Sequence, residues 1–207
     1  MAPSVLVIGG AIHFIDPTQM LIAFHKPYGV LSQFTPDHPG QRTLAEFGFP
    51  KSVFPIGRLD RDSEGLLLLG DEPGIVGRLL DPKHAHPRTY QVQVEGCPDA
   101  ATVDRLARGG IDIKGHRTLP CVARLLDPSP DFPPRDPPVR FRKSVPDRWI
   151  ELILTEGKNR QVRRMTAAVG IPTLRLIRVA IGNLNLAEVS HGTWRELTTN
   201  DRKLLGR

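Results

Sequence analysis

The chain has 207 residues, of which 40% are hydrophobic, so one large domain or two small ones can bury a core. Lys and Arg total 28 against 22 Asp and Glu, and the formal net charge of +6 favours polyanions over acidic partners or neutral metabolites. Two cysteines without a CxxC pair argue against a disulfide framework or a structural zinc site and fit a cytoplasmic protein. The N-terminal apolar runs are too short to cross a bilayer, so neither export nor membrane anchoring is expected.

The first half of the chain contains three strand-like segments. Leu21–Phe24 is apolar and runs into Lys26–Gly29, which predicts a strand followed by a Pro-Gly turn. Leu66–Leu69 is a continuous apolar run between glycines, which predicts a short strand buried on both faces. Thr89–Val94 alternates with period two and predicts a half-buried strand, with Tyr90 on the same face as two valines.

The second half adds further strands and helices. The pattern predicts a helix at Asp99–Arg108, a strand at Trp149–Leu154, a helix from Asn159 to Val169 and a strand at Thr173–Val179. Residues 127–138 are too rich in proline for a central strand and predict a surface loop. Because strands and helices are interspersed without regular βαβ alternation, we expect an α+β fold with a mainly antiparallel or mixed sheet and flanking helices.

The segment Gly57–Gly65 places three acids and two arginines directly before the predicted buried strand. A charge run of this kind is usually a solvated loop whose surface ion pairs contribute at most about 1 kcal/mol each. Here the buried strand that follows favours a different interpretation, in which a carboxylate stays ionised because a cation lies beside it.

The segment Glu156–Met165 is a second unusual cluster, with four cations in the first turns of a predicted helix. The helix dipole disfavours each cation there by roughly 0.3–1 kcal/mol. A solvated helix face is one explanation. A bound anion, either a carboxylate or a phosphate, explains the placement better.

These two segments resemble the catalytic motif and the C-terminal basic motif of bacterial rRNA pseudouridine synthases of the RsuA branch. Lys26–Gly29 and Arg88–Val92 are similar to two weaker motifs, and all four stand in the family's order, which makes the resemblance specific. Within the branch the chain is most similar to the E-type large-subunit enzymes. Gln33–Thr35 and the Pro-rich loop leading to Arg142–Pro146 carry that finer resemblance.

The resemblance implies a single catalytic domain over residues 21–207, with the Pro-rich loop at 127–138 and no S4-type RNA-binding domain. Residues 1–20 are then an N-terminal extension to which no role is assigned. Two features depart from the family pattern. Gly70–Gly74 replaces a Thr-Asn-Asp-Gly ending and His25 replaces an Asn, which leaves the local loop shapes open.

By resemblance, Asp60 is the catalytic carboxylate and acts either as a nucleophile or as a base on the ribose. Arg163 matches the cation that pairs with this Asp, although phosphate binding alone would also explain it. Tyr90 matches an aromatic residue that stacks on the target base, with a core tyrosine as the plain alternative, and Arg58 matches a residue that enters the RNA helix. The remaining candidate substrate-binding cations, expected to bind phosphate or to support the fold, are Lys26, Arg160, Arg164, Arg175 and Arg178.

The reaction implied by the resemblance needs no cofactor and no metal, and His84 and His86 are interpreted as loop polarity. The expected partner is 23S rRNA or a large-subunit assembly intermediate. The target would be a flipped-out uridine in the domain that includes the peptidyl-transferase centre. A monomer without an obligate protein partner is expected. The alternatives are the same chemistry on another rRNA uridine, a non-catalytic RNA-binding assembly factor, and a glycosidase-like enzyme with Asp62 or Glu64 as its acid.

Overall fold

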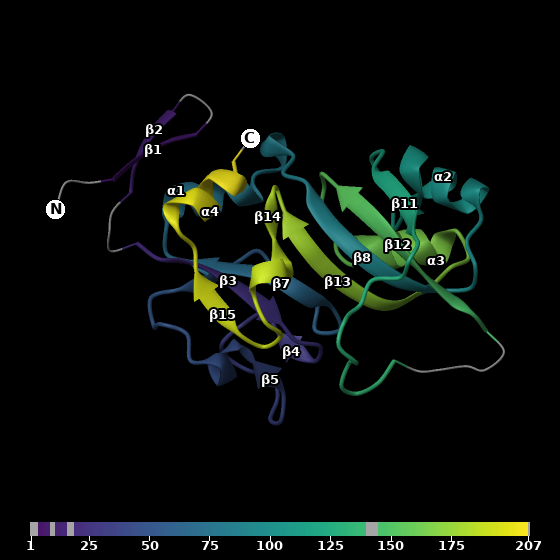
Figure 1. Ribbon diagram of the computed structural model, residues 1–207, viewed down its shortest axis with the longest axis horizontal. Coiled ribbons are helices and arrows are strands. Elements are labelled where there is room, and N and C mark those ends of the chain that lie inside the picture. Colours follow the sequence, from purple (N-terminus) through teal and green to yellow (C-terminus); the bar gives the residue numbers. More distant parts are fainter. Residues whose placement is uncertain (1–3, 9–10, 16–18, 140–144, 207) are drawn as a thin grey trace. The chain divides into compact units, whose positions relative to one another are not determined.

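The computed structural model describes residues 4–8, 11–15, 19–139 and 145–206 (Figure 1). The chain divides into two compact units: unit 1 comprises Met1–His86 and Val179–Arg207, and unit 2 comprises Pro87–Arg178. None of the helices in the described ranges is long and apolar enough to cross a membrane. Of the segment that carried part of the finer resemblance, Arg142, Lys143 and Ser144 lie outside the described residues.

In unit 1, β3 (Leu21–Lys26) pairs antiparallel with β7 (Glu64–Gly70) on one side and with β15 (Trp194–Glu196) on the other. β7 also pairs antiparallel with β6 (Phe54–Ile56). Every residue of β7 is buried, which confirms the strand predicted at Leu66–Leu69. Apolar side chains on both faces therefore fix this strand in the core.

The core of unit 1 includes an aromatic cluster on β3 and β15. Phe24 lies 4.8 Å from Phe47 and 5.0 Å from Phe49, measured between ring centroids, and the Trp194 indole donates a hydrogen bond to the Phe47 carbonyl at 3.0 Å. The smaller elements of the unit are β1 (Ser4–Ile8), β2 (Ala11–Ile15), β4 (Val30–Leu31), β5 (Arg42–Thr43), η1 (Leu44–Phe47), α1 (Pro73–Leu80), η2 (Pro82–His84), β14 (Leu184–Asn185), η3 (Leu186–Glu188) and α4 (Thr199–Leu204).

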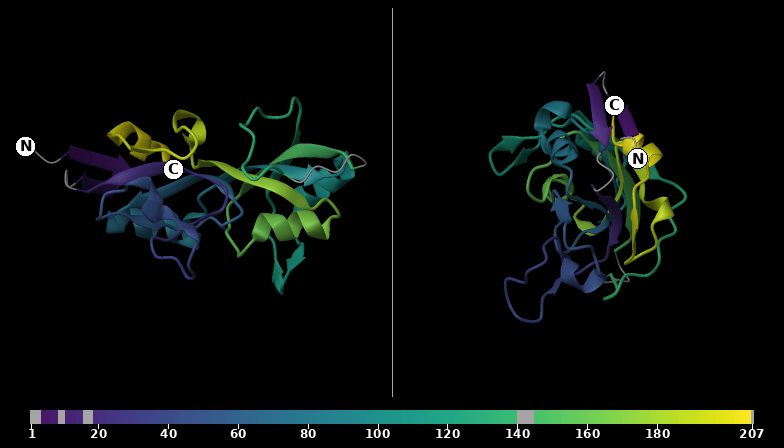
Figure 2. Two further views of the ribbon diagram at one scale, coloured as in Figure 1. Left: turned by 90° about the horizontal axis from the view of Figure 1, so that it is seen from below. Right: turned by 90° about the vertical axis from the view of Figure 1, so that its left-hand side faces the viewer.

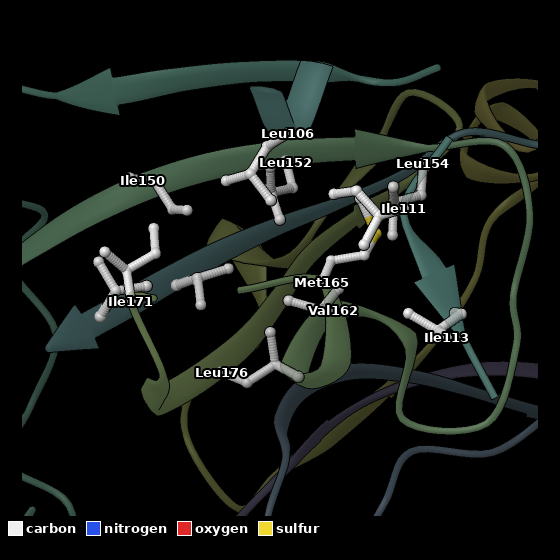
Figure 3. Close-up of a cluster of buried hydrophobic side chains, with 12 residues drawn as sticks. Leu106, Ile111, Ile113, Ile150, Leu152, Leu154, Val162, Met165, Ile171 and Leu176 are labelled. Atoms are coloured by element: carbon white, nitrogen blue, oxygen red, sulfur yellow. The ribbon is translucent and has the colours of Figure 1, made fainter. Parts of the chain in front are cut away.

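In unit 2, β12 (Asp147–Leu154) pairs antiparallel with β8 (Arg88–Glu95) and with β11 (Val122–Leu126). The apolar faces of these strands pack with α2 (Ala100–Arg108) and α3 (Gln161–Ala168), as Figure 3 shows for Leu106, Leu152 and Met165. β9 (Asp112–Ile113) and β10 (His116–Arg117) form a short hairpin. β13 (Thr173–Ile181) runs from unit 2 into unit 1, where it pairs with β14.

Helices and antiparallel strands follow one another without βαβ repeats, which confirms the α+β class (Figure 2). The strands expected at Thr89–Val94, Trp149–Leu154 and Thr173–Val179 are present, and so is the helix at Asp99–Arg108, in which the Asp99 side chain accepts a hydrogen bond from Thr102 N–H.

The predicted start of the helix at Asn159 is wrong. α3 begins at Gln161, because Arg160 adopts a left-handed backbone conformation with φ 51°. Lys158 and Arg160 therefore precede the helix, and only Arg163 and Arg164 occupy its first turn. The helix ends at Ala168, one residue before the predicted end, and Gly170 follows the C-cap Val169 as the predicted glycine, with φ 83°.

Residues 127–138 form no helix or strand and are mostly exposed, which confirms the predicted surface loop. One side chain of this loop is nevertheless packed inward. Phe132 lies 5.5 Å from the Trp149 ring, and the guanidinium carbon of Arg175 lies 5.7 Å from the Phe132 ring centroid. These two contacts therefore hold the middle of the loop against β12 and β13.

Candidate active site

Asp60 lies in the loop that joins β6 to β7. This loop begins at Gly57, whose φ of 73° suits glycine and whose Cβ, if present, would lie 3.1 Å from a Leu80 side-chain carbon. Within the loop Leu59 is 7% exposed, whereas Asp60 is half-buried and Arg58 is exposed. Leu59 thus anchors the loop in the core, and the two residues beside it stay accessible.

The turn after β3 supports the loop through one backbone and one side-chain hydrogen bond. Gly29 N–H donates to the Arg61 carbonyl at 2.8 Å, and the Arg61 Nε donates back to the Gly29 carbonyl at 3.4 Å. Gly29 has φ 81°, a conformation that suits glycine in the Pro-Gly turn predicted from the sequence. The turn therefore places the Gly29 N–H and carbonyl beside the loop. Two further residues, Ser32 and Gln33, also contact the loop, and sequence reasoning assigned them no role.

Lys26 is fully buried at the end of β3. Its ammonium donates to the Pro27 carbonyl at 3.0 Å and to the Val30 carbonyl at 2.7 Å. A cation with no exposed surface cannot reach an RNA phosphate. Of the two roles that the sequence left open for Lys26, the structure favours support of the fold.

Glu64 also differs from the surface acid that a charged loop suggests. It opens β7 and is 1% exposed, whereas Asp62 is half-buried. Ser63 is likewise 1% exposed, and within the described ranges its hydroxyl has no hydrogen-bond partner. The charged segment is therefore only partly a solvated loop.

In unit 2, the loop before α3 is organised around Glu156. Its carboxylate accepts from Leu119 N–H at 2.8 Å and from the Gln161 amide at 2.6 Å, and it lies 2.8 Å from the His116 Nε2. Burial alone would raise the pKa of Glu156, but these hydrogen bonds outweigh it and hold the pKa below its usual range. Gln161 in turn accepts from Lys158 N–H at 2.9 Å. Sequence reasoning gave Glu156 no role, because two of its partners, His116 on β10 and Leu119 after it, are 40 and 37 positions away in the chain.

The basic residues of this segment are not equivalent. Lys158 and Arg160 are exposed, and Arg164 is half-buried with one N–H on the Asn159 side chain at 2.7 Å. Arg163 is also half-buried and donates to the Thr173 carbonyl at 3.5 Å. The Lys158–Arg164 segment therefore offers an accessible positive surface together with cations held in place.

Arg175 and Arg178 on β13 are 6% and 5% exposed. Arg175 donates to the Pro133 carbonyl at 3.0 Å, in the same loop that its guanidinium stacks on. Arg178 is hydrogen-bonded to Tyr90, and burial lowers the pKa of its guanidinium although the phenol partly offsets this. Both arginines were candidate phosphate ligands, and their burial favours the alternative role in supporting the fold.

The candidate residues divide between the units. Lys26, Arg58 and Asp60 belong to unit 1. Tyr90 and the arginines of α3 and β13 belong to unit 2, which ends at Arg178. The ion pair expected between Asp60 and Arg163 remains a prediction. In the part of the chain that the structure describes, no group of three or more His, Cys, Asp or Glu side chains is arranged to hold a metal ion.

Residues 20–168 match the family model described as RNA pseudouridylate synthase. The loop that carries Asp60 and the Lys158–Arg164 segment both lie inside this range. The chain therefore belongs to the RNA pseudouridine synthase family, whose members are isomerases. It is 58% identical over 185 residues to "Ribosomal large subunit pseudouridine synthase E" of Xanthomonas axonopodis pv. citri (strain 306), covering 88% of this chain and 97% of the relative. It is 46% identical to the protein of the same name from Vibrio vulnificus (strain CMCP6), covering 86% and 75%.

The fold agrees with this assignment. A solved structure titled "Crystal structure of pseudouridylate synthase" superposes with a TM-score of 0.73 at 26% identity, covering 93% of this chain and 76% of that one. The predicted family and the predicted fold class are both confirmed.

Proposed function

We propose that this protein isomerises one uridine of large-subunit rRNA to pseudouridine, acting on 23S rRNA or on an assembling large subunit. The observation that carries the proposal is the 58% identity to a large-subunit pseudouridine synthase, which extends over nearly the whole of that relative. The net charge of +6 and the exposed cations before α3 suit a polyanionic substrate.

The chemistry falls to Asp60. The N-glycosidic bond between uracil N1 and the ribose breaks, the base turns, and a new bond joins C5 of the base to the same ribose carbon. C5 loses a proton and N1 gains one, so that the product is an isomer. The Asp60 carboxylate starts the reaction either by attacking the ribose carbon or by removing a ribose proton. The buried Leu59 beside it supports this role, since it holds the loop while Asp60 remains accessible.

Three other residues complete the proposed site. Arg163 pairs with Asp60 and keeps the carboxylate ionised. Tyr90 stacks on the flipped base, and Arg58 occupies the place that the base leaves in the RNA helix. Exposure of Arg58 supports its role, because a side chain that enters a helix has to reach beyond the protein surface.

The target uridine is proposed to lie in the rRNA domain that includes the peptidyl-transferase centre, and the enzyme to act in the cytoplasm as a monomer without an obligate protein partner. The alternative is that the protein carries out the same isomerisation on another rRNA uridine. A relative named "Ribosomal large subunit pseudouridine synthase B" from Bacillus subtilis (strain 168) is 34% identical over 192 residues, so a different large-subunit site is the nearest alternative.

The proposal is tested by incubating the protein with unmodified 23S rRNA and mapping pseudouridine at nucleotide resolution. The wild-type protein should form one pseudouridine. Asp60→Asn is nearly isosteric and should lower turnover by at least about 10³-fold while fold and RNA affinity persist, because an amide supplies neither a nucleophile nor a base. Asp62→Asn, a change of the same kind two residues away, and Glu196→Gln, at an exposed carboxylate of β15, should retain substantial activity.

The outcomes separate the rivals. A folded wild-type protein that binds the RNA but forms no pseudouridine would support the non-catalytic assembly factor. Modification of a different nucleotide would change the target and leave the chemistry in place. Near wild-type turnover of Asp60→Asn would remove Asp60 from the proposal.

A further inference from the structure

Two neighbouring polar residues after β4, Ser32 and Gln33, contact the loop that carries Arg58 and Asp60. Ser32 is 4% exposed, and its hydroxyl makes two hydrogen bonds to one residue of the loop. It donates to the Leu59 carbonyl at 2.8 Å and accepts from Leu59 N–H at 3.1 Å. A single hydroxyl thus holds both peptide groups that flank Leu59, and these are the peptides that join Leu59 to Arg58 and to Asp60.

Gln33 acts on the side chain of Arg58. Its Oε1 accepts from an Arg58 Nη at 3.2 Å. Its Nε2 donates to the Thr35 carbonyl at 2.8 Å and to the Asp37 carboxylate at 2.9 Å. The backbone carbonyl of Gln33 accepts from Leu44 N–H at 2.9 Å. Because both ends of the amide are engaged, Gln33 presents its oxygen to Arg58 in one fixed orientation.

Arg58 is exposed, and an exposed arginine ordinarily samples many rotamers, whose loss on binding costs free energy. A fixed acceptor reduces that cost before the RNA arrives. The position of the Asp60 carboxylate also matters, since misplacing a catalytic group by about 1 Å can lower a rate by about 10²-fold. The backbone on either side of Leu59 sets where the Asp60 carboxylate stands.

We propose that Ser32 and Gln33 are positioning residues for the reaction: Ser32 fixes the backbone that carries Asp60, and Gln33 fixes the guanidinium of Arg58. The inference rests on the proposed function, because it assigns the loop to catalysis and Arg58 to RNA. Ser32 should act mainly on kcat, and Gln33 should act mainly on KM.

The experiment measures kcat and KM on 23S rRNA, together with thermal unfolding. Ser32→Ala should lower kcat by about 10- to 100-fold with little change in KM. Ser63→Ala is the matched control, because Ser63 lies in the loop itself and is equally buried, and its hydroxyl makes no hydrogen bond within the described ranges. Ser63→Ala should change kcat less than about threefold. Ser32→Cys keeps a small side chain with a weaker hydrogen-bonding group and should fall between wild type and Ser32→Ala.

Gln33→Ala should raise KM about tenfold with a smaller effect on kcat. Gln41→Ala is its control, since Gln41 accepts from Asp37 N–H at 2.8 Å and His38 N–H at 3.0 Å and so shapes the same loop. In an Arg58→Ala background, Gln33→Ala should add no further increase in KM, because a residue that acts through Arg58 has nothing left to position.

Wild-type turnover in the same assay separates the two levels of the proposal. If wild type forms no pseudouridine, the proposed function fails. If wild type is active and folded Ser32→Ala has an unchanged kcat, or if Gln33→Ala and Arg58→Ala have additive effects on KM, then Ser32 or Gln33 respectively is structural only and the inference is overturned for that residue.

Discussion

The guanidinium of Arg178 is hydrogen-bonded to the phenol of Tyr90, and burial lowers the pKa of that guanidinium. Tyr90, the residue proposed to stack on the base, therefore also accepts a hydrogen bond from Arg178, which is only 5% exposed. This changes what the two obvious substitutions of Tyr90 should do, because each removes a different part of its function.

Tyr90→Phe keeps the ring but leaves the Arg178 guanidinium without the phenol oxygen. We expect it to lower the free energy of unfolding by about 1–3 kcal/mol, the usual cost of removing one partner of a buried charged hydrogen bond. RNA capture should largely survive, because stacking needs only the ring. Tyr90→Ala should lose stability and also weaken RNA binding by about 1–3 kcal/mol. Urea unfolding and RNA titration of both variants provide the measurement, and equal RNA affinities of the two variants would argue against stacking.

RNA affinity should fall steeply with salt, because the exposed cations before α3 are suited to phosphates. Arg160→Ala removes an exposed cation and should reduce the slope of log affinity against log salt by about 1. Arg175→Met is the contrasting change, since Arg175 is 6% exposed and contacts the Pro-rich loop instead of solvent. Its slope should match wild type. A wild-type affinity that stays flat between low and physiological salt would contradict the basic-surface interpretation.

The two cysteines should differ in reactivity. Burial, and to a smaller extent the charge of Glu156, raise the pKa of Cys121 to about 11, and its thiol lies 3.4 Å from the Leu106 carbonyl, whereas Cys97 is exposed. At pH 8 only about 10⁻³ of the Cys121 thiol is ionised, so alkylation should label the exposed Cys97 well before Cys121. The Cys121 rate should rise with pH up to about 11. In Cys97→Ser, rapid labelling at pH 8 would show that Cys121 is accessible as a thiolate.

The strands and helices with strong periodicity were predictable from the sequence, and so were the two charged segments. Leu66–Leu69 could be assigned as buried because no polar residue interrupts the run. α1 was missed, although Pro73 at its first position and the spacing of Ile75, Val76, Leu79 and Leu80 signal a short helix. The late start of α3 could not be predicted, because nothing in the sequence marks Arg160 as the residue with a left-handed backbone.

The roles of the individual basic residues were not predictable for a different reason. Sequence distinguishes a cation from a neutral residue but does not say what lies opposite it after folding. Arg175 contacts Pro133, which is 42 positions away, and Ser32 contacts Leu59 across 27 positions. Contacts at such separations are set by the pairing of strands, so burial of Lys26, Arg175 and Arg178 could be recognised only in the structure.

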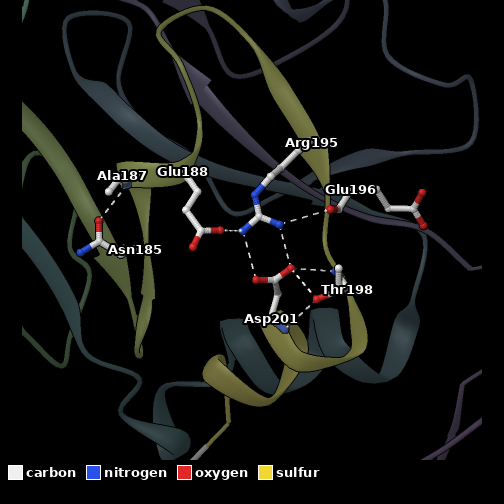
Figure 4. A network of polar contacts seen from close by, with 7 residues as sticks. All are labelled: Asn185, Ala187, Glu188, Arg195, Glu196, Thr198 and Asp201. Carbon is white, nitrogen blue, oxygen red and sulfur yellow. Dashed lines mark hydrogen bonds and ion pairs between the residues drawn. The ribbon is translucent and has the colours of Figure 1, made fainter.

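The C-terminal part of unit 1 is held by an ion-pair network centred on Arg195 (Figure 4). Arg195 donates to both oxygens of Asp201, at 2.7 Å and 3.0 Å, and to Glu188 at 2.7 Å. Asp201 also accepts from the Thr198 hydroxyl and backbone N–H, both at 2.8 Å, as part of the capping box of α4. Hydrogen bonding from Arg195, followed by that from Thr198, holds the pKa of Asp201 well below its usual range despite partial burial.

A carboxylate whose pKa is lower in the folded state stabilises the protein above its unfolded pKa of about 4, and that contribution is lost as pH falls through the folded pKa. We therefore expect Asp201→Asn to lower the free energy of unfolding by about 1–2 kcal/mol at pH 5–7, the range typical of a charge-assisted hydrogen bond that is partly exposed. The difference from wild type should shrink below about pH 4. Glu196→Gln, which changes an exposed carboxylate on the same segment, should show less than about 0.5 kcal/mol at any pH. The free energies of unfolding of both proteins are measured in urea from pH 2.5 to pH 7. If their difference stays constant over this range, Asp201 stabilises α4 by its shape and not by its charge.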